Sequence, residues 1–284
     1  MRVYKGHGTE NDFVVIPDLD GALELSPAVV RALCDRHAGI GADGVLRVVR
    51  SDNDPDAKEM ALEAPYFMDY RNADGTIAEM CGNGARVFLR YLQAASLVGL
   101  SATVATRSGV KRVETAEDGT VTVEMGRPEP SAGQPSVTGR DGVSRPGRSI
   151  SMPNPHVVVW LDNAGALQDL DLTVAPVVAP TGPHGQNVEF GIRLGPRHLA
   201  MRVFERGVGE TRSCGTGICA VAVAAAEADQ VGADGGAWRV DVPGGTCEVI
   251  WRTDGQLQLR GPAVLVASID LDDAWLAALM RRGD

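Results

Sequence analysis

The sequence predicts an α+β fold with two similar lobes, and three observations lead to this fold class. Residues 81–84 and 214–217 repeat each other, because each segment is a cysteine followed by Gly-x-Gly at the start of an apolar run of helical length. Short apolar runs typical of strands lie before and after each repeat. Strands and helices do not alternate regularly, which argues against a doubly wound parallel sheet.

Local patterns predict the elements of the first half of the chain. Ser26 followed by Pro27 begins a helix that extends to about residue 37, with serine as N-cap and proline at the first helical position. A second helix is expected from residue 84 to about 95. The expected strands are residues 13–16, 45–49, 66–70, 102–106, 111–114 and 121–125.

The second half repeats this organisation. Its helix, residues 217–229, is almost entirely alanine and valine, so we expect it to be buried on all sides and surrounded by strands. The expected strands are residues 157–161, 188–192, 199–204, 238–242, 248–251 and 256–260.

The domain boundary is expected in residues 126–147, which are rich in Pro, Gly and Ser. Residues 1–126 would form a lobe carrying Cys81, and residues 127–270 a lobe carrying Cys214. The C-terminal segment, about residues 271–284, is expected to pack back on the first lobe through an amphipathic helix with Trp275, Leu276 and Leu279.

Composition excludes several classes of protein. With 284 residues, 44% hydrophobic and 23% charged, the chain has the composition of a soluble globular protein. A net charge of −10 argues against nucleic acid or an anionic membrane as a partner. Neither a signal peptide nor a spanning segment is recognisable, so a cytoplasmic location is expected.

The cysteines are five in number, and their spacing suits neither a disulfide framework nor a metal site. Cys34, Cys219 and Cys247 lie among apolar neighbours and are interpreted as core residues. Cys81 and Cys214 each precede a helix N-terminus, where free N–H groups and the helix dipole favour thiolate. A small buried residue is the alternative for either one, but the repetition suggests an acid–base pair.

Other motifs do not indicate a cofactor or a metal. The GxGxxG pattern of residues 39–44 follows a helix and precedes a strand, the reverse of the dinucleotide-binding order, so we interpret it as a turn. Lys5, Lys58 and Lys111 lack a recognisable pyridoxal phosphate setting. The histidines show no paired ligand spacing.

Short polar groups instead gather near the two cysteines. Amides occur at turns beside strands, and Glu205-Arg206 precedes Cys214. A zwitterionic amino acid needs such groups, because Arg pairs with a carboxylate, Glu accepts from an ammonium group and amides orient both.

Six segments together resemble the diaminopimelate epimerase family: KGHGTENDFVV, DYRNADG, MCGNGAR, PNPH, QNVEF and ERGVGETRSCGTG. The resemblance implies cofactor-independent epimerisation of LL- to meso-diaminopimelate, on the route to lysine and peptidoglycan. It also implies two pseudo-symmetric lobes, each a strand barrel around a central helix, with the active site in the cleft between them. A homodimer is compatible with the same resemblance.

The resemblance also assigns residues by motif. Cys81 and Cys214 match the two catalytic residues, and His156 and Glu205 match positions that tune the thiols. The positions that match substrate contacts are Asn11, Asn72, Gly82, Asn83, Asn154, Asn187, Glu205, Arg206, Gly215 and Thr216.

Two departures and three alternatives accompany this assignment. Gly44 stands where many members have Gln, and Pro153 where Gly is usual. A related two-cysteine racemase of another amino acid is one alternative, although Asn72, Asn187 and Arg206 keep the epimerase identities. A thiol redox enzyme and an amino-acid binding module are the others, and solvent deuterium incorporation at Cα would separate them from an epimerase.

Overall fold

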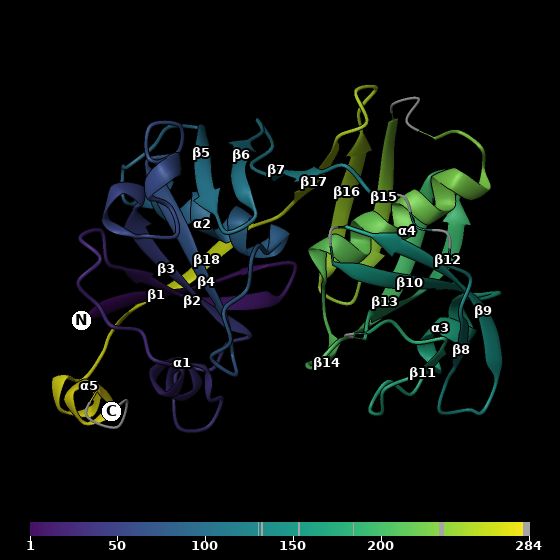
Figure 1. Ribbon diagram of the computed structural model, residues 1–284, viewed down its shortest axis with the longest axis horizontal. Coiled ribbons are helices and arrows are strands. Elements are labelled where there is room, and N and C mark those ends of the chain that lie inside the picture. The colour runs from purple at the N-terminus through teal and green to yellow at the C-terminus, as the bar shows by residue number, and fades with distance from the viewer. Residues whose placement is uncertain (130, 132, 153, 184, 233–235, 281–284) are drawn as a thin grey trace. The chain divides into compact units, whose positions relative to one another are not determined.

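The computed structural model describes residues 1–129, 131, 133–152, 154–183, 185–232 and 236–280 (Figure 1). The chain forms two compact units. Unit 1 comprises Met1–Val123 and Pro262–Asp284, and unit 2 comprises Glu124–Gly261. No helix in the described part of the chain is long and apolar enough to cross a membrane.

Unit 1 consists of strands packed around one helix. Its strands are β1 (Arg2–Gly8), β2 (Asn11–Pro17), β3 (Gly44–Arg50), β4 (Tyr66–Asn72), β5 (Ser101–Thr106), β6 (Gly109–Thr115) and β18 (Val264–Asp270), and β7 (Val121–Gly126) runs across the boundary to unit 2. Its helices are α1 (Pro27–Cys34), α2 (Gly82–Ala94) and α5 (Asp273–Met280), with 3-10 turns at Ser51–Asn53 and Lys58–Met60. Helix α2 contacts β1 to β6 and β18.

Unit 2 has the same plan. Its strands are β8 (Ser136–Thr138), β9 (Ser144–Ser151), β10 (Pro155–Trp160), β11 (Val177–Ala179), β12 (Asn187–Gly195), β13 (His198–Glu205), β14 (Gly209–Thr211), β15 (Gly236–Val242), β16 (Gly245–Trp251) and β17 (Leu257–Gly261). Its helices are α3 (Ala164–Gln168) and α4 (Gly215–Ala228). Helix α4 contacts β9, β10, β12, β13, β15, β16 and β17.

Strand pairing reveals an internal repeat. In unit 1 the order is β1–β2–β3–β4–β5–β6–β7, with β2/β3 and β4/β5 parallel and the other pairs antiparallel. In unit 2 the order β9–β10–β12–β13–β15–β16–β17 is parallel at β10/β12 and β13/β15 and antiparallel elsewhere. Helices follow the second and fourth strands in both. The α+β class and the similarity of the two lobes are therefore confirmed, although pairing among the described residues closes neither sheet into a ring.

The two central helices begin where the sequence predicts, within two residues. Cys81 is the N-cap of α2, and Cys214 is the N-cap of α4. Every residue from Gly217 to Ala226 is buried, so the prediction that the alanine- and valine-rich helix is surrounded by protein is confirmed. Helix α1 ends at Cys34, earlier than predicted, because the N–H groups of Ile40 and Gly41 bond back to the carbonyl of Leu33.

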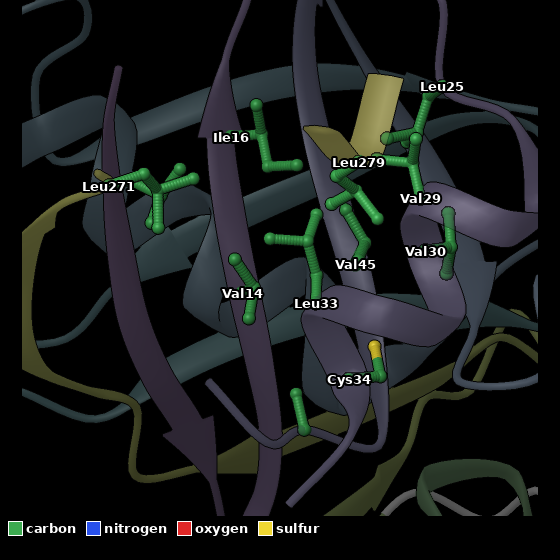
Figure 2. Close-up of a cluster of buried hydrophobic side chains, with 12 residues drawn as sticks. Val14, Ile16, Leu25, Val29, Val30, Leu33, Cys34, Val45, Leu271 and Leu279 are labelled. Carbon is green, nitrogen blue, oxygen red and sulfur yellow. The ribbon is translucent and has the colours of Figure 1, made fainter. Parts of the chain in front are cut away.

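The end of the chain belongs to unit 1. Strand β18 pairs antiparallel with β1, so Pro262–Asp270 lies in this unit, whereas the sequence analysis assigned residues up to 270 to the second lobe. Leu279 of α5 packs with Leu33 of α1 and with Val14 and Val45 in one buried cluster (Figure 2). Burial of this cluster holds the C-terminal helix against α1.

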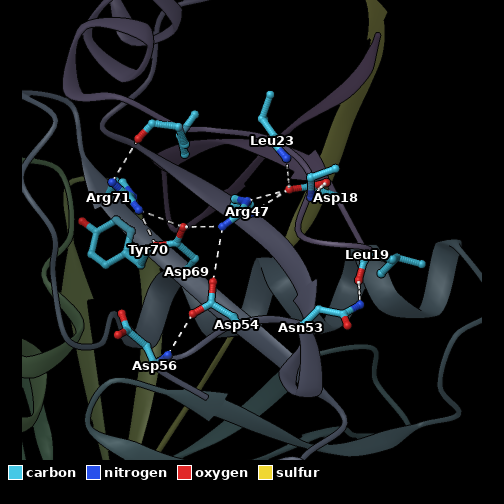
Figure 3. A network of polar contacts seen from close by, with 12 residues as sticks. Asp18, Leu19, Leu23, Arg47, Asn53, Asp54, Asp56, Asp69, Tyr70 and Arg71 are labelled. Carbon is cyan, nitrogen blue, oxygen red and sulfur yellow. Dashed lines mark hydrogen bonds and ion pairs between the residues drawn. The ribbon is translucent and has the colours of Figure 1, made fainter. Parts of the chain in front are cut away.

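A buried ionic network supports the sheet of unit 1. The Arg47 guanidinium on β3 lies 2.8 Å from the Asp18 carboxylate and 3.4 Å from those of Asp54 and Asp69 (Figure 3). Arg71 also bonds Asp69. Arg47 thus connects the loop after β2, the segment after the 3-10 turn at Ser51–Asn53, and strand β4. Removing this side chain would leave buried carboxylates without their shared partner.

The segments that the sequence analysis missed are mostly short or exposed. Strands β8 and β9 lie largely within residues 126–147, which were predicted to be an irregular boundary. Strands β1 and β18 were also missed: β1 has few apolar residues although it pairs with the neighbouring β2, and β18 pairs with β1 from the far end of the chain. The turn predicted at residues 39–44 is confirmed, since α1 precedes it and β3 follows it.

Candidate active site

The half-site of unit 1 is built around the N-terminus of α2. The Cys81 sulfur accepts a hydrogen bond from the backbone N–H of Gly84 at 3.3 Å. Its S–H donates to Oδ1 of Asn11, which is 3.7 Å away at the start of β2. The amide of Asn83, buried in the first turn of α2, donates to the same oxygen at 3.2 Å. The fold therefore brings Asn11, Gly82 and Asn83 next to Cys81.

Asn72, the last residue of β4, is held by different partners. Its Oδ1 accepts from the Tyr70 hydroxyl at 2.8 Å, and its Nδ2 donates to Thr76 at 3.0 Å. The departure at Gly44 is explained here, because a Cβ at Gly44 would lie 2.8 Å from Cε2 of Tyr70 and 2.6 Å from a backbone oxygen. The Tyr70 ring thus occupies the space that a longer side chain would need. Pro153, the other departure, lies outside the described residues.

The half-site of unit 2 is built around the N-terminus of α4. Burial raises the pKa of the Cys214 thiol well above its ordinary value, and the charges of Glu205 and Glu189 raise it further. The expectation that the helix N-terminus makes this cysteine a thiolate is therefore wrong for Cys214. Hydrogen bonds from the Thr216 hydroxyl and from the backbone N–H of Gly217 lower this pKa, but they are outweighed by burial and the two carboxylates.

Glu205, at the end of β13, shares this environment. Burial raises the pKa of its carboxyl, while hydrogen bonds from Thr211 and Cys214 act in the opposite direction. The Cys214 thiol thus donates to a carboxylate that itself holds a proton more readily than usual. Such a pair can exchange one proton between sulfur and oxygen.

A chain of polar contacts leads away from Cys214. Its sulfur lies 3.5 Å from Oγ1 of Thr216, which accepts from Nδ2 of Asn154 at 3.2 Å. Oδ1 of Asn154 lies 3.1 Å from Nε2 of His156, and Nδ1 of His156 lies 2.7 Å from Oε1 of Glu189. Four predicted residues are therefore joined in one network.

Glu189 is the member of this network that sequence reasoning did not assign. It is fully buried on β12, and among the described residues its Oε2 has no hydrogen-bond partner. A Cβ at Gly217 would lie 2.6 Å from its Oε1, so only glycine lets α4 approach this carboxylate. In the sequence, Glu189 could have been noticed as the single carboxylate in residues 187–192, which form the buried part of β12. A buried charge needs a polar partner, so a carboxylate in such a strand indicates a polar site.

Asn187 is the first residue of β12, and Arg206 directly follows β13. Oδ1 of Asn187 accepts from the backbone N–H of Arg206 at 2.8 Å. The Arg206 side chain is exposed, with its Nη1 at 3.5 Å from the Gly185 carbonyl. An exposed guanidinium beside a fixed amide suits a carboxylate ligand.

Comparisons with known proteins decide the family. The diaminopimelate epimerase family model matches residues 3–130 and 148–266. The diaminopimelate epimerase of Streptomyces coelicolor is 54% identical over 288 residues, and the match covers 97% of each protein. The chain belongs to the diaminopimelate epimerase family. Every site residue predicted from the sequence lies within the ranges matched by the diaminopimelate epimerase model.

Solved structures of more distant proteins share the diaminopimelate epimerase fold. A phenazine biosynthesis protein of the PhzF family from Bacillus anthracis aligns with a TM-score of 0.69 at 16% identity, covering 96% of this chain and 99% of that one. A probable proline racemase from Agrobacterium radiobacter K84 aligns with a TM-score of 0.69 at 14% identity, covering 96% and 93%. Membership of the diaminopimelate epimerase family favours the epimerase interpretation over the redox and binding-module alternatives.

Proposed function

We propose that this protein epimerises LL-diaminopimelate to meso-diaminopimelate by two-base proton transfer at Cα, without a cofactor. The observation that carries this proposal is the repeated half-site. Each unit has one cysteine at the N-terminus of its central helix, with acid, amide or hydroxyl groups in contact with the sulfur. The family match over nearly the whole chain supports the substrate.

Inversion of a stereocentre requires a proton to leave one face of the carbon and another to arrive on the opposite face. In one direction, the Cys214 thiol passes its proton to Glu205 and its thiolate then removes the proton of Cα. The C–H electron pair remains on the substrate as a carbanion stabilised by the adjacent carboxylate. Cys81 then donates its S–H proton to the other face, which leaves Cys81 as thiolate and Cys214 as thiol.

Charge stabilisation comes from the helix N-termini. The backbone N–H groups of Gly82 and Asn83, and of Gly215 and Thr216, lie in the first turns of α2 and α4. N–H groups in the first turn of a helix stabilise negative charge that develops on a bound carboxylate. His156 and Asn154 orient the Thr216 hydroxyl beside Cys214.

We assign the distal end of the substrate to Arg206, Asn72 and Asn187. Arg206 would pair with the distal carboxylate, and the two amides would orient that carboxylate and the distal ammonium group. A site built for these charges discriminates against a substrate that lacks one of them, because its own polar groups are left unpaired. We further propose a cytoplasmic enzyme that forms a homodimer.

The experiment follows Cα deuteration in D2O together with chiral chromatography of the product. We expect the wild type to epimerise diaminopimelate and to turn over lysine, which lacks the distal carboxylate, several orders of magnitude more slowly. Cys81→Ala and Cys214→Ala should each abolish epimerisation, because one face then has no proton carrier.

Cys34→Ala is the matched control for these variants. Burial raises the pKa of the Cys34 thiol to about 12, so this group carries no proton chemistry at neutral pH, and the variant should keep its activity. Near wild-type epimerisation by either active-site alanine variant would contradict the two-base assignment. Equal rates with lysine and diaminopimelate would contradict the substrate.

A further inference from the structure

The turn at residues 39–44 ends in a carboxylate that reaches the half-site of unit 1. Asp43 directly precedes β3, and its Oδ2 accepts from Nδ2 of Asn11 at 2.8 Å and from the backbone N–H of Asp12 at 3.1 Å. Its Oδ1 accepts from Arg36 at 2.7 Å. An ionised carboxylate only accepts hydrogen bonds, so it selects which end of the Asn11 amide faces it.

The other end of the Asn11 amide is fixed as firmly. Its Oδ1 accepts from Nδ2 of Asn83, and the Asn83 orientation is set by Arg86, which donates to Oδ1 of Asn83 at 2.8 Å. Arg86 is fully buried and also donates to Thr9 in the turn that leads into β2. Reversing the Asn11 amide would place an oxygen against Asp43 and an NH2 group against the NH2 group of Asn83.

This arrangement places an acceptor on the Cys81 sulfur. The Asn11 oxygen, 3.7 Å away, accepts from a thiol and repels a thiolate, whereas the Gly84 N–H at 3.3 Å favours a thiolate. Asp43 hydrogen-bonds Asn11, and Asn11 accepts from the Cys81 thiol, so Asp43 acts on the protonation of Cys81 through Asn11.

We propose that Asp43 is a positioning residue, which keeps the Asn11 carbonyl oxygen on Cys81 and thereby holds this thiol protonated in the free enzyme. The role assigned to that proton rests on the proposed function: Cys81 is then ready to donate to the substrate carbanion while the Cys214–Glu205 pair serves as base.

The charged groups around Asp43 determine the control. Lys5 of β1 bonds Asp12 at 2.6 Å, and Arg36 bonds both Asp12 and Asp43. Asp12 and Asp43 thus belong to one cluster of charged side chains. The charges of this cluster also act on the pKa of Cys34 in α1. Among the described charged residues of this cluster, Asp43 is the one that hydrogen-bonds the Asn11 side chain. Asp12→Asn therefore removes the same charge without touching Asn11.

The test measures iodoacetamide modification of Cys81 between pH 5 and 9, by mass spectrometry of its peptide, in wild type, D43N and D12N. In D43N the new amide can donate to Asn11, so the constraint from Asp43 is lost and only the contact with Asn83 still favours the original orientation. Conformers in which Asn11 turns its NH2 group toward the sulfur and stabilises thiolate then become more populated. We expect the D43N profile to move about one pH unit lower, a roughly tenfold faster reaction on the rising limb, with a much smaller change in D12N.

Two results would overturn the proposal. One is a D43N profile that matches wild type, and the other is a D12N profile that moves as far as that of D43N, because charge alone would then explain the change. Asn11→Ala is the second variant, should D43N not fold. Removing the acceptor should move the Cys81 profile lower in the same way, and an unchanged profile counts against the proposal.

The modification profile does not depend on turnover. Failure of wild type to exchange the Cα proton of diaminopimelate would remove the proposed function and leave the Asp43–Asn11–Cys81 arrangement standing. Normal exchange in wild type, together with an unmoved D43N profile, would remove only the role of Asp43.

Discussion

At the scale of single residues, burial decides the state of the reactive groups of unit 2. Cys214 and Glu205 both have raised pKa values, with burial as the largest cause in each case, and Cys214 is raised further by the two nearby carboxylates. A helix N-terminus typically contributes less than the loss of water around an ion. Both groups therefore hold their protons more readily than they would in water, and the base role that we propose for Cys214 depends on Glu205.

Glu189→Gln tests the electrostatic part of this account. The variant keeps a hydrogen-bonding group beside His156 but removes one negative charge that raises the pKa of Cys214. The pKa of Cys214 should fall, so its thiolate fraction at a fixed neutral pH should rise. Modification of Cys214 by methyl methanethiosulfonate should then be about three to ten times faster.

Glu210→Gln is the control for this variant, because Glu210 belongs to the same unit but pairs with Arg202 at 2.7 Å. Its Cys214 reactivity should stay at the wild-type level. A Glu189→Gln protein whose Cys214 reacts at the wild-type rate or more slowly would show that the Glu189 charge does not act on this thiol.

At the scale of elements, parallel strand pairs carry the half-sites. Asn11 and Asp43 lie at the starts of the parallel strands β2 and β3, and His156 and Glu189 lie on the parallel strands β10 and β12. These pairs occupy the same place in the two halves of the repeat. In each, a carboxylate at the start of the later strand or on it hydrogen-bonds a polar side chain of the earlier strand, and a cysteine is the N-cap of the central helix.

Arg47→Met tests what holds the strands of unit 1 in place. Arg47 is buried and shared by three carboxylates, so its loss should destabilise unit 1 by about 3 kcal/mol. Hydrogen exchange of peptides from β2, β3 and β4 should become faster, while peptides of unit 2 should change little.

The exposed pair between Arg2 and Asp270 provides the comparison for this variant. Arg2→Met removes an ion pair that water already screens, so exchange in unit 1 should not change measurably. Equal exchange in the Arg47 and Arg2 variants would mean that the buried network does not stabilise the sheet.

At the scale of the whole molecule, depressed carboxyl pKa values predict acid sensitivity. Hydrogen bonds from Arg36 and Lys5 outweigh burial and lower the pKa of Asp12 to about 2, and those from Arg71 and Arg107 likewise lower the pKa of Asp69. A carboxyl whose pKa is lower in the folded chain than in the unfolded chain stabilises the fold at pH values above its unfolded pKa, near 3.9. This contribution is lost as the pH falls through the pKa of the folded state.

The contribution of these depressed carboxyls to the free energy of unfolding should therefore be nearly constant above about pH 5 and be lost between about pH 4 and 2. Asp12 alone should contribute about 2 kcal/mol to this loss. Urea unfolding of wild type and Asp12→Asn across this range measures the difference, and we expect a shallower decline in the variant. Parallel declines in the two proteins would contradict the contribution assigned to Asp12.

The carboxyls of Asp43 and Glu205 act in the opposite sense. Burial raises the pKa of Asp43 and of Glu205, so keeping them ionised at neutral pH opposes folding. Both contact residues assigned to the site, Asp43 through Asn11 and Glu205 through Cys214. Favourable interactions elsewhere in the fold must therefore offset the cost of keeping these two carboxyls ionised.

Much of the fold could be predicted from local sequence, because caps and periodicity act over a few residues. The helices that begin after Cys81 and Cys214, the buried alanine-rich segment and most central strands were found in this way. Strand β18 was not, since its partner β1 lies at the other end of the chain, and β1 was not, because it has few apolar residues although it pairs with the neighbouring β2. The family and its motif residues were recognisable because they occur in contiguous strings.

The sequence by itself determined the α+β class, the two cysteine-bearing helices and the family, because each depends on residues that are neighbours along the chain. Only the tertiary structure decided that burial raises the pKa of Cys214, that Glu189 contacts His156 and that Asp43 hydrogen-bonds Asn11. Burial and hydrogen-bond partners depend on which distant segments lie together, and those segments meet only when the strands pair around the central helices.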